Sequence, residues 1–460
     1  MQDRMTTTIA AHHALLSTGW ADAISIEIDD DGVISDIRAG TSGADHTADI
    51  LLPALANVHS HSFQRAMAGL AETRGPNTID DFWTWRRVMY RFLQLLTPDD
   101  IEAIAALVQM EMLEAGYAAQ AEFHYVHHAP GGDHYDNIAE TSLRHLEAAK
   151  QTGIGYTHLP VLYMQGGLDG RPLVGGQLRF GCTIDEFEML YQDIQKHLQN
   201  YASDYRLGVA PHSLRAVSSE GLNAVITYAP NSPIHIHAAE QVKEIEEVVA
   251  TLGTRPVEWL LSNTPIDSNW CLIHATHMQD TEVDRLAASG AVAGLCPLTE
   301  ANLGDGIFNA TRFIEHGGVF GIGSDSNILI RLSEELRQLE TSQRLRDRHR
   351  VILTSEQTLS NGRFLYETAA IGGARAVGRN TGRLEIGAGA DMVALSHDTV
   401  ELSGLRGDTI LDTWLFACDD HLVTDVWAAG RLVVSEGRHI QHAAITQKYK
   451  MVIERLRAAL

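Results

Sequence analysis

The feature that most restricts the fold of this chain is a series of short apolar segments. Each one ends in polar residues, and most are followed by a helix-like stretch such as 98–115 or 183–200. Alternation of this kind is typical of α/β proteins with parallel strands. Eight such units predict a (β/α)8 barrel of the TIM type, whose functional residues lie at the carboxyl ends of the strands. The eight segments are 51–58, 122–126, 156–162, 207–210, 234–236, 271–273, 291–295 and 319–322.

Both ends of the chain have a different pattern. Residues 23–28 and 33–37 alternate apolar and polar side chains around the turn 29–32, which is typical of a β-hairpin, and 391–395 and 426–434 are similar. Chain termini often lie close together, so we expect both ends to form one small β-sandwich domain. The predicted domains are residues 1–52 and 379–440 for the two parts of the sandwich, 53–378 for the barrel and 441–460 for a C-terminal helix.

Composition disfavours several functional classes. The 35 basic and 59 acidic residues give a formal net charge of -24, which disfavours nucleic acid or an anionic membrane as partner. The four cysteines are far apart, which argues against a disulfide framework or a thiolate zinc site. Residues 1–11 lack a long apolar core, and no segment reaches the length of a membrane span. We therefore expect a cytoplasmic enzyme.

Metal-ligating residue types follow several of the predicted strands. His59 and His61 are two residues apart, so on a strand their side chains face the same side. His237, His274 and Asp325 end later strands. Each alone is compatible with a structural histidine or, for Asp325, a helix N-cap. Together they supply the nitrogen and carboxylate ligands of an open catalytic Zn²⁺ site, although Fe²⁺, Mn²⁺ or Co²⁺ would also accept them.

Glu240 lies three residues after His237, where a strand is expected to turn into a helix. It could be a solvated acidic residue in the first helical turn, favoured by the helix dipole. It could also face the same cavity as His237 and transfer protons there. Because candidate metal ligands are close in the sequence, we favour proton transfer.

These motifs resemble those of the amidohydrolase superfamily, and segment 382–391 resembles its returning β-domain strand. More narrowly, nearly the whole chain resembles the formimidoylglutamate deiminases of histidine degradation. It departs from them at Leu298, where a small polar residue is expected, and at Asn327, where a histidine is expected and the pocket rim could change. The matching strings are 59–70, 82–86, 89–91, 212–215, 238–241, 256–260, 295–297 and 299–306.

The resemblance implies a metal-dependent hydrolase that converts N-formimino-L-glutamate to N-formyl-L-glutamate and ammonia. It implies a homodimer with one Zn²⁺ per chain, held by His59, His61, His237 and Asp325. His212 ends the fourth strand, where a lysine or glutamate would bridge a second metal, and this agrees with a single ion.

The residue chemistry agrees with this expectation. A metal ion lowers the pKa of bound water and supplies hydroxide near neutral pH. Asp325 can accept the water proton, while Glu240 can pair with the cationic imino nitrogen and then protonate departing ammonia. His274 can polarise the attacking water or ligate the metal, and the sequence leaves both roles open.

The substrate of such an enzyme carries two carboxylates, which arginine binds in a bidentate manner. The resemblance implies that Arg86 and Arg215 do so, helped by Gln64, Tyr125 and His212. Spacing alone would favour a surface position for Arg86, beside Arg87 on a predicted helix.

Two other functions are compatible with parts of this pattern. One is an amidohydrolase-superfamily deaminase acting on a purine, pterin or triazine ring, which would need stacking aromatic residues more than two arginines. The other is a barrel that has lost catalysis and serves as an interaction protein. The second is disfavoured because every ligand type is present.

Overall fold

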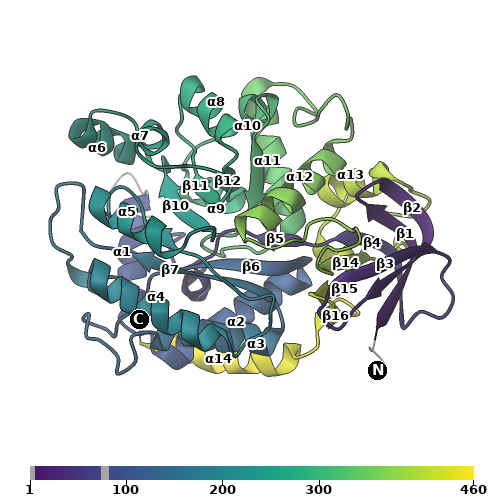
Figure 1. Ribbon diagram of the computed structural model, residues 1–460, viewed down its shortest axis with the longest axis horizontal. Helices are drawn as coiled ribbons and strands as arrows, with labels where there is room; N and C mark the ends of the chain where they lie inside the picture. The colour runs from purple at the N-terminus through teal and green to yellow at the C-terminus, as the bar shows by residue number, and fades with distance from the viewer. Residues whose placement is uncertain (1–5, 74–81, 460) are drawn as a thin grey trace.

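The computed structural model describes residues 6–73 and 82–459. One of its two sheets is a parallel barrel with the strand order β10-β11-β12-β13-β5-β6-β7-β8, in which β9 also pairs with β7 (Figure 1). Its strands are β5 (Leu55–Asn57), β6 (Tyr117–His124), β7 (Gly155–Leu162), β8 (Arg206–Leu207), β9 (Ala210–Pro211), β10 (Ile234–Ala238), β11 (Trp270–His274), β12 (Val292–Leu295) and β13 (Val319–Ile322).

The barrel closes between its fourth strand position and β10. Two short strands, β8 and β9, occupy the fourth position, and Val209 between them forms a parallel bridge to Ile234. The Val209 N–H donates to the Pro233 carbonyl at 3.0 Å. A Cβ at Gly208 would overlap that carbonyl, so only glycine allows the two backbones to approach this closely.

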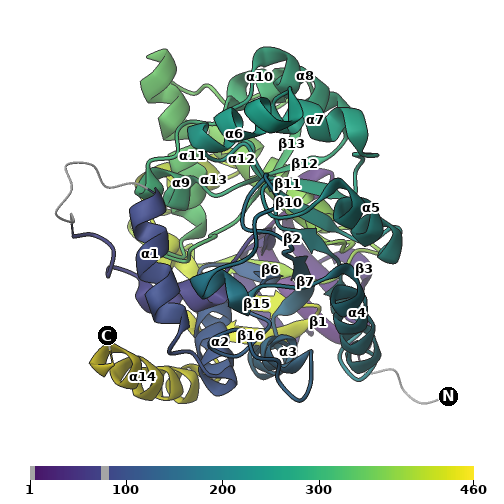
Figure 2. The same ribbon diagram turned by 90° about the vertical axis from the view of Figure 1, so that its left-hand side faces the viewer.

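Helices surround the barrel strands as an outer ring (Figure 2). Several begin at side-chain caps, as at Thr97, whose hydroxyl accepts from the Asp100 N–H before Pro98 starts α2. The barrel helices are η1 (Ser62–Met67), α1 (Phe82–Leu93), α2 (Pro98–Glu114), α3 (Glu140–Thr152), η2 (Gly175–Arg179), α4 (Ile184–Leu198), α5 (Ser219–Tyr228), α6 (Val242–Leu252), α7 (Pro256–Asn263), α8 (Asp280–Ser289), α9 (Pro297–Leu303), α10 (Ala310–Glu315), α11 (Leu332–Asp347) and α12 (Asn361–Ala376).

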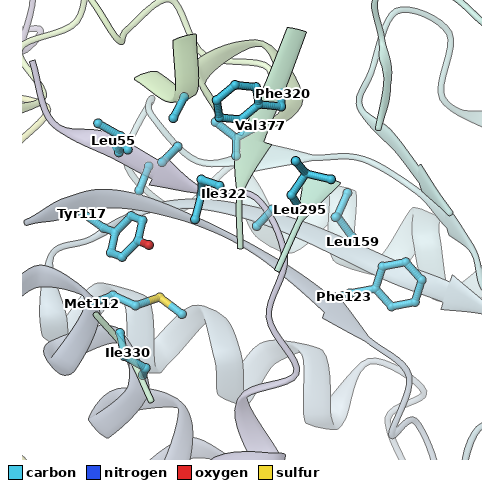
Figure 3. Packing of buried hydrophobic residues seen from close by; sticks show 14 of the residues in the cluster. Leu55, Met112, Tyr117, Phe123, Leu159, Leu295, Phe320, Ile322, Ile330 and Val377 are labelled. Carbon is cyan, nitrogen blue, oxygen red and sulfur yellow. The ribbon is translucent and has the colours of Figure 1, made fainter. Parts of the chain in front are cut away.

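Apolar side chains from different barrel strands meet in the main core. Figure 3 shows Phe123 of β6, Leu159 of β7, Leu295 of β12 and Ile322 of β13 among them, and all four are buried. The Phe123 ring also lies 4.4 Å, between centroids, from the ring of His237. The core therefore extends directly to the residues at the carboxyl ends of the strands.

The second sheet joins the two ends of the chain in the order β17-β16-β15-β14-β4-β1-β2-β3. Only β1 and β4 pair in parallel among its neighbouring strands. Residues of β1 to β4 share a core of their own with residues of β14 and β15. The strands are β1 (Thr7–Leu16), β2 (Gly19–Ile28), β3 (Ile34–Ala39), β4 (His46–Pro53), β14 (Met392–Leu395), β15 (Val423–Ala428), β16 (Arg431–Ser435) and β17 (Arg438–His439).

The predicted fold class, a TIM-type barrel with a β-sandwich domain built from both chain ends, is confirmed. One expected strand is divided, however: 51–53 of the segment 51–58 belongs to β4 in the end sheet, and only Leu55–Asn57 pairs in the barrel. The remaining helices are α13 (Asp408–Ala417), η3 (Asp420–Leu422) and α14 (His442–Ala458).

The exact domain limits stay predictions. Within the region expected to be sandwich, α13 packs against the barrel helices α11 and α12, and the C-terminal helix α14 packs against α2. Residues 1–5 and 460 of the predicted domains lie outside the described residues. Along the described parts of the chain, the helices are too short or too polar to cross a membrane.

Candidate metal centre and substrate pocket

Five of the residues expected at strand ends converge on one point at the carboxyl end of the barrel. His59 Nε2 lies 3.1 Å from His237 Nε2, and both His59 Nε2 and His61 Nε2 lie 3.4 Å from Asp325 Oδ1. His274 Nε2 is 3.9 Å from Asp325 Oδ2. All five side chains are buried. The barrel thus gathers four histidines and one aspartate from four strand ends.

The ring nitrogens of two of the histidines, His61 and His237, are oriented as in a metal site. His61 Nδ1 lies 3.0 Å from the carbonyl of Phe123, and His237 Nδ1 lies 3.1 Å from that of His212. A carbonyl can only accept a hydrogen bond, so each Nδ1 donates and each Nε2 keeps its lone pair for the centre. Burial and the neighbouring histidines lower the pKa of His61 to about 3 and that of His237 well below its usual value, which keeps both rings neutral.

The spacing of the donors fits one divalent ion. His59, His61 and His237 form one group, and His59, His274 and Asp325 form another, in which the ligand atoms all lie within 4.8 Å of one another. Two imidazoles bound to the same Zn²⁺ at about 2.0–2.1 Å have nitrogens roughly 3.0–3.4 Å apart, which agrees with the separation of His59 and His237. The donor set and its spacing therefore fit a mononuclear centre.

The backbone around this centre is strained. Left-handed conformations of non-glycine residues cost about 1–3 kcal/mol each and collect at functional sites. Hydrogen bonds hold them here, such as those from the Asp325 N–H to the His59 carbonyl and from the Ala275 N–H to the Ala238 carbonyl, both 2.9 Å. The residues with positive φ next to the site are Ala239, His274, Ala275, Asp325 and Asn327.

Glu240 faces the same cavity as His237, and its carboxylate lies 3.9 Å from His274 Nε2. Burial raises the pKa of Glu240, and the charge of His274 opposes this shift. The turn that presents Glu240 is held by Glu244, whose carboxylate accepts from the N–H groups of Ala239 and Glu240 at 3.1 Å each. This supporting role could not be predicted from the sequence, because an acidic residue in a first helical turn is common.

His274 differs from the other histidines of the centre because carboxylates surround it. Its Nδ1 lies 3.2 Å from Glu300, whose carboxylate also accepts from the Cys296 N–H at 3.0 Å. Burial lowers the pKa of His274, but Glu240, Glu300 and Asp325 outweigh it and raise the pKa to about 10. Glu300 lies in the matching string 299–306, yet its role could not be read from sequence.

A pocket opens above the centre. All the residues expected to bind metal or substrate line it except His59, which is buried beneath. Glu240 and His274 also line it, and the other lining residues, which are aromatic or apolar, were not predicted from the sequence. The lining residues are His61, Gln64, Trp85, Arg86, Met89, Tyr125, Tyr163, Phe180, His212, Arg215, His237, Glu240, His274, Leu303 and Asp325.

Arg86 lies in this pocket. Its position beside Arg87 on a predicted helix had, taken alone, favoured a place on the protein surface. It is half-buried, whereas its neighbour Arg87 is exposed. Its Nη2 donates to the hydroxyl of Tyr163 at 3.1 Å, and its guanidinium lies 5.1 Å from the centroid of the Tyr90 ring. Tyr163 directly follows β7, so its position at a strand end was the signal that could have identified it.

The other expected substrate contacts lie nearby. Gln64 Nε2 donates to the Tyr125 hydroxyl at 2.9 Å, and His212 Nδ1 lies 2.9 Å from Ser213 Oγ. Arg215 lines the pocket from the loop that follows β9.

The two departures from the family pattern lie outside the pocket lining. The expected change at the pocket rim is wrong for Asn327, which is fully buried, donates to Ser60 Oγ at 3.1 Å and accepts from Ser324 Oγ at 2.6 Å. Leu298 donates its N–H to Glu335 at 2.9 Å.

The barrel and its histidine–aspartate centre define a class, and comparison with known proteins names it. The family model described as "Amidohydrolase family" matches residues 50–433, so the chain belongs to the amidohydrolase family. The model "Formimidoylglutamate deiminase HutF, N-terminal domain" matches residues 6–47. The formimidoylglutamate deiminase of Pseudomonas aeruginosa is 47% identical over 453 residues, which cover 98% of this chain and 99% of the relative. Within the amidohydrolases, the chain is therefore a member of the formimidoylglutamate deiminases.

Solved structures support the amidohydrolase class and its fold. An amidohydrolase from Brucella melitensis superposes with a TM-score of 0.93 at 45% identity, covering 98% of this chain and all of that one. An adenosine deaminase from Xanthomonas campestris with bound zinc has a TM-score of 0.82, covers 98% of both chains and is 19% identical. The second likeness shows the fold alone.

Proposed function

We propose that this chain hydrolyses N-formimino-L-glutamate to N-formyl-L-glutamate and ammonia in histidine degradation. The observation that carries this proposal is the combination, in one pocket, of a buried histidine–aspartate centre with Arg86 and Arg215. The centre suits hydrolysis of a C–N bond, and two arginines suit a substrate with two carboxylates. The 47% identity to a formimidoylglutamate deiminase over almost the full length of both chains supports the same substrate.

We assign the metal to His59, His61, His237 and Asp325, with one divalent ion per chain. Zn²⁺ suits three imidazoles and a carboxylate, and Fe²⁺, Mn²⁺ and Co²⁺ accept the same donors. A divalent ion held by these residues would lower the pKa of a bound water and would polarise the group that is attacked.

Two side chains then carry the protons. Asp325 accepts the proton that leaves the attacking water, and the water oxygen bonds to the formimino carbon. Glu240 pairs as a carboxylate with the cationic imino nitrogen, takes up the second water proton from the hydroxyl of the adduct, and delivers it to that nitrogen as the C–N bond breaks and ammonia departs. His274 lies 3.9 Å from both carboxylates, which suits a hydrogen-bond donor between them.

The carboxylates of the substrate are bound on the other side of the pocket. Arg86 and Arg215 pair with them, and Gln64, Tyr125 and His212 complete the polar contacts. Tyr163 holds Arg86 in place through the 3.1 Å hydrogen bond to its guanidinium. Selection for a dicarboxylate follows, because a ligand lacking one carboxylate would leave a partly buried arginine without its partner.

A ring deaminase is the second candidate, and the aromatic lining of the pocket favours it. Trp85, Tyr125, Tyr163 and Phe180 could stack on a flat substrate. The hydroxyls of Tyr125 and Tyr163, however, accept hydrogen bonds from Gln64 and Arg86. These hydrogen bonds orient the two rings toward residues that we assign to the substrate carboxylates.

One assay separates the two candidates. Purified protein should release ammonia from N-formimino-L-glutamate, and a chelator should abolish this release until Zn²⁺ is added back. Guanine, adenosine and cytosine, tested in parallel, should not react. Faster turnover of one of these rings would reject the proposal. The homodimeric state and the cytoplasmic location expected from the sequence stay predictions, for which size-exclusion chromatography with light scattering and cell fractionation are the measurements.

A further inference from the structure

A second hollow adjoins the substrate pocket on its outer side. It shares Arg86, Tyr163 and Arg215 with the pocket, and it adds Arg171 from the loop after β7 and Lys243 from the first turn of α6. We call this hollow the vestibule. Because it shares both substrate-binding arginines with the pocket, it is continuous with the pocket on the arginine side.

The vestibule concentrates positive charge in a chain that is strongly acidic. Among the described residues, Arg86, Arg171, Arg215 and Lys243 line it together with the carboxylate of Glu247, whereas the whole chain has 35 basic and 59 acidic residues. The charges are partly compensated, since Lys243 Nζ lies 3.9 Å from Glu247 and Arg171 Nε lies 3.1 Å from Asp169. Cations therefore outnumber carboxylates among the described residues of this lining.

The two outer cations are accessible from solvent. The side chains of Arg171 and Lys243 are 57% and 56% exposed, so a ligand can reach them before it enters the pocket.

The loop after β7 also makes room for the side chain of Arg171. The Gly166 N–H donates to the Arg171 carbonyl at 2.8 Å, and a Cβ at Gly167 would overlap the Arg171 guanidinium. Glycine at position 167 therefore lets the Arg171 side chain lie flat against the loop.

We infer that the vestibule is an outer binding site for small dicarboxylates, in which Arg171 and Lys243 capture the substrate and pass it to Arg86 and Arg215. The choice of dicarboxylate rests on the proposed function. A chain of net charge -24 repels a dianion at long range, and salt screens this repulsion beyond roughly 8–10 Å. Cations that line a hollow next to the pocket attract a dianion over a short distance and raise its local concentration there.

The test compares charge-removing variants at two salt concentrations. At about 0.01 M ionic strength, Arg171→Gln and Lys243→Gln should each lower kcat/KM by roughly 2- to 5-fold and leave kcat unchanged, and at about 1 M salt the difference should vanish because charges more than about 3 Å apart are screened. Glu247→Gln should raise kcat/KM at low salt. Lys150→Gln is the matched control, because Lys150 is 66% exposed at the opposite end of the barrel on α3.

A second variant tests the position of Arg171 and not only its charge. Gly167→Ala keeps every charge but displaces the flexible end of Arg171, so kcat/KM at low salt should fall as in Arg171→Gln, with unchanged thermal unfolding. Wild-type kcat/KM in Arg171→Gln and Lys243→Gln at low salt would overturn the inference. A loss that persists at high salt, or a fall in kcat, would also overturn it, because the residues would then act inside the pocket.

Failure of the proposed function would be visible separately. If the wild type does not release ammonia from N-formimino-L-glutamate, the function is wrong, and calorimetric titration with glutarate at low salt then tests the vestibule on its own. Weaker glutarate binding in Lys243→Gln than in Lys150→Gln would support an outer dicarboxylate site, and equal binding would reject it.

Discussion

The floor and the wall of the substrate pocket are built from different parts of the barrel. At the floor, His59, His61 and His237 are buried at strand ends, and backbone carbonyls orient the rings of His61 and His237. At the wall, Arg86 and Arg215 come from a helix and a loop and are half-buried. The floor is therefore the more enclosed part of the pocket, and the wall is the more exposed part. We expect the floor to carry the reaction and the wall to determine the choice of substrate.

The largest effect should follow from breaking the floor itself. His59→Ala removes a fully buried donor that lies within 3.4 Å of both His237 and Asp325, so metal and activity should be lost together. Elemental analysis of the purified variant measures the metal directly. His12→Ala, at a side chain 58% exposed on β1, is the control and should keep both. Full metal occupancy in His59→Ala would mean that the assigned ligand set is wrong.

Glu240→Gln tests whether metal binding and proton transfer depend on different residues of the floor. The amide keeps the size of the side chain but cannot deliver the proton, so turnover should fall by roughly 10²- to 10⁴-fold. Metal content and thermal unfolding should match the wild type, because Glu240 is not among the assigned ligands. Near-normal kcat in this variant would remove Glu240 from the reaction.

Breaking the wall should affect substrate selection and leave the metal in place. Losing one partner of a desolvated arginine–carboxylate pair costs on the order of 2–5 kcal/mol, so Arg215→Met should lower kcat/KM for N-formimino-L-glutamate by roughly 30- to several-thousand-fold. An analogue without the matching carboxylate should react poorly with the wild type and lose little more in the variant. Equal reaction of the analogue and the full substrate with the wild type would favour the ring-deaminase alternative.

Arg86 and Arg87 are neighbours on the same helix, so variants of the two form a matched pair that tests the wall. Arg86→Met should lower kcat/KM, by about 10-fold or more, because its guanidinium faces the pocket beside Tyr163. Arg87→Met should have no effect, since Arg87 is exposed on the same helix. Similar kinetics in the two variants would show that Arg86 does not contact the substrate.

Sequence patterns predicted the barrel because alternation of apolar segments and helices is a direct consequence of parallel strands covered by helices. They did not predict that two short strands, β8 and β9, occupy the fourth strand position of the barrel. This division accompanies the close approach of Gly208 to the Pro233 carbonyl, a contact between segments that are distant in the sequence. They separated candidate ligands from structural histidines only because five metal-ligating residues fell at the ends of four different strands. Arg86 and Arg87 are chemically identical, so only the resemblance, and then the fold, could distinguish them.

The supporting carboxylates were beyond sequence reasoning for a related reason. Glu244 and Glu300 are acidic residues near helix starts, a position that the helix dipole favours anywhere on a protein surface. Their burial, and the N–H groups and imidazole that they bind, depend on how helices α6 and α9 dock against the strand ends. Residues that hold a site together thus carry a weaker sequence signal than residues that perform its chemistry.

The last variants test whether the floor depends on such support. Glu300 bonds His274 Nδ1 and the Cys296 N–H, so it fixes the ring of His274 without reaching the pocket, whose lining does not include it. Glu300→Ala should lower kcat by roughly 10- to 100-fold, the range typical of residues that orient a ligand or catalytic group, with KM little changed. Glu300→Gln can still accept both hydrogen bonds through its amide oxygen, so it should recover much of the loss if orientation is what matters. If the glutamine variant is as impaired as the alanine variant, the negative charge beside His274 is the required feature. If neither variant lowers kcat, the floor does not need the support of Glu300, and the positions of its residues at the strand ends are sufficient.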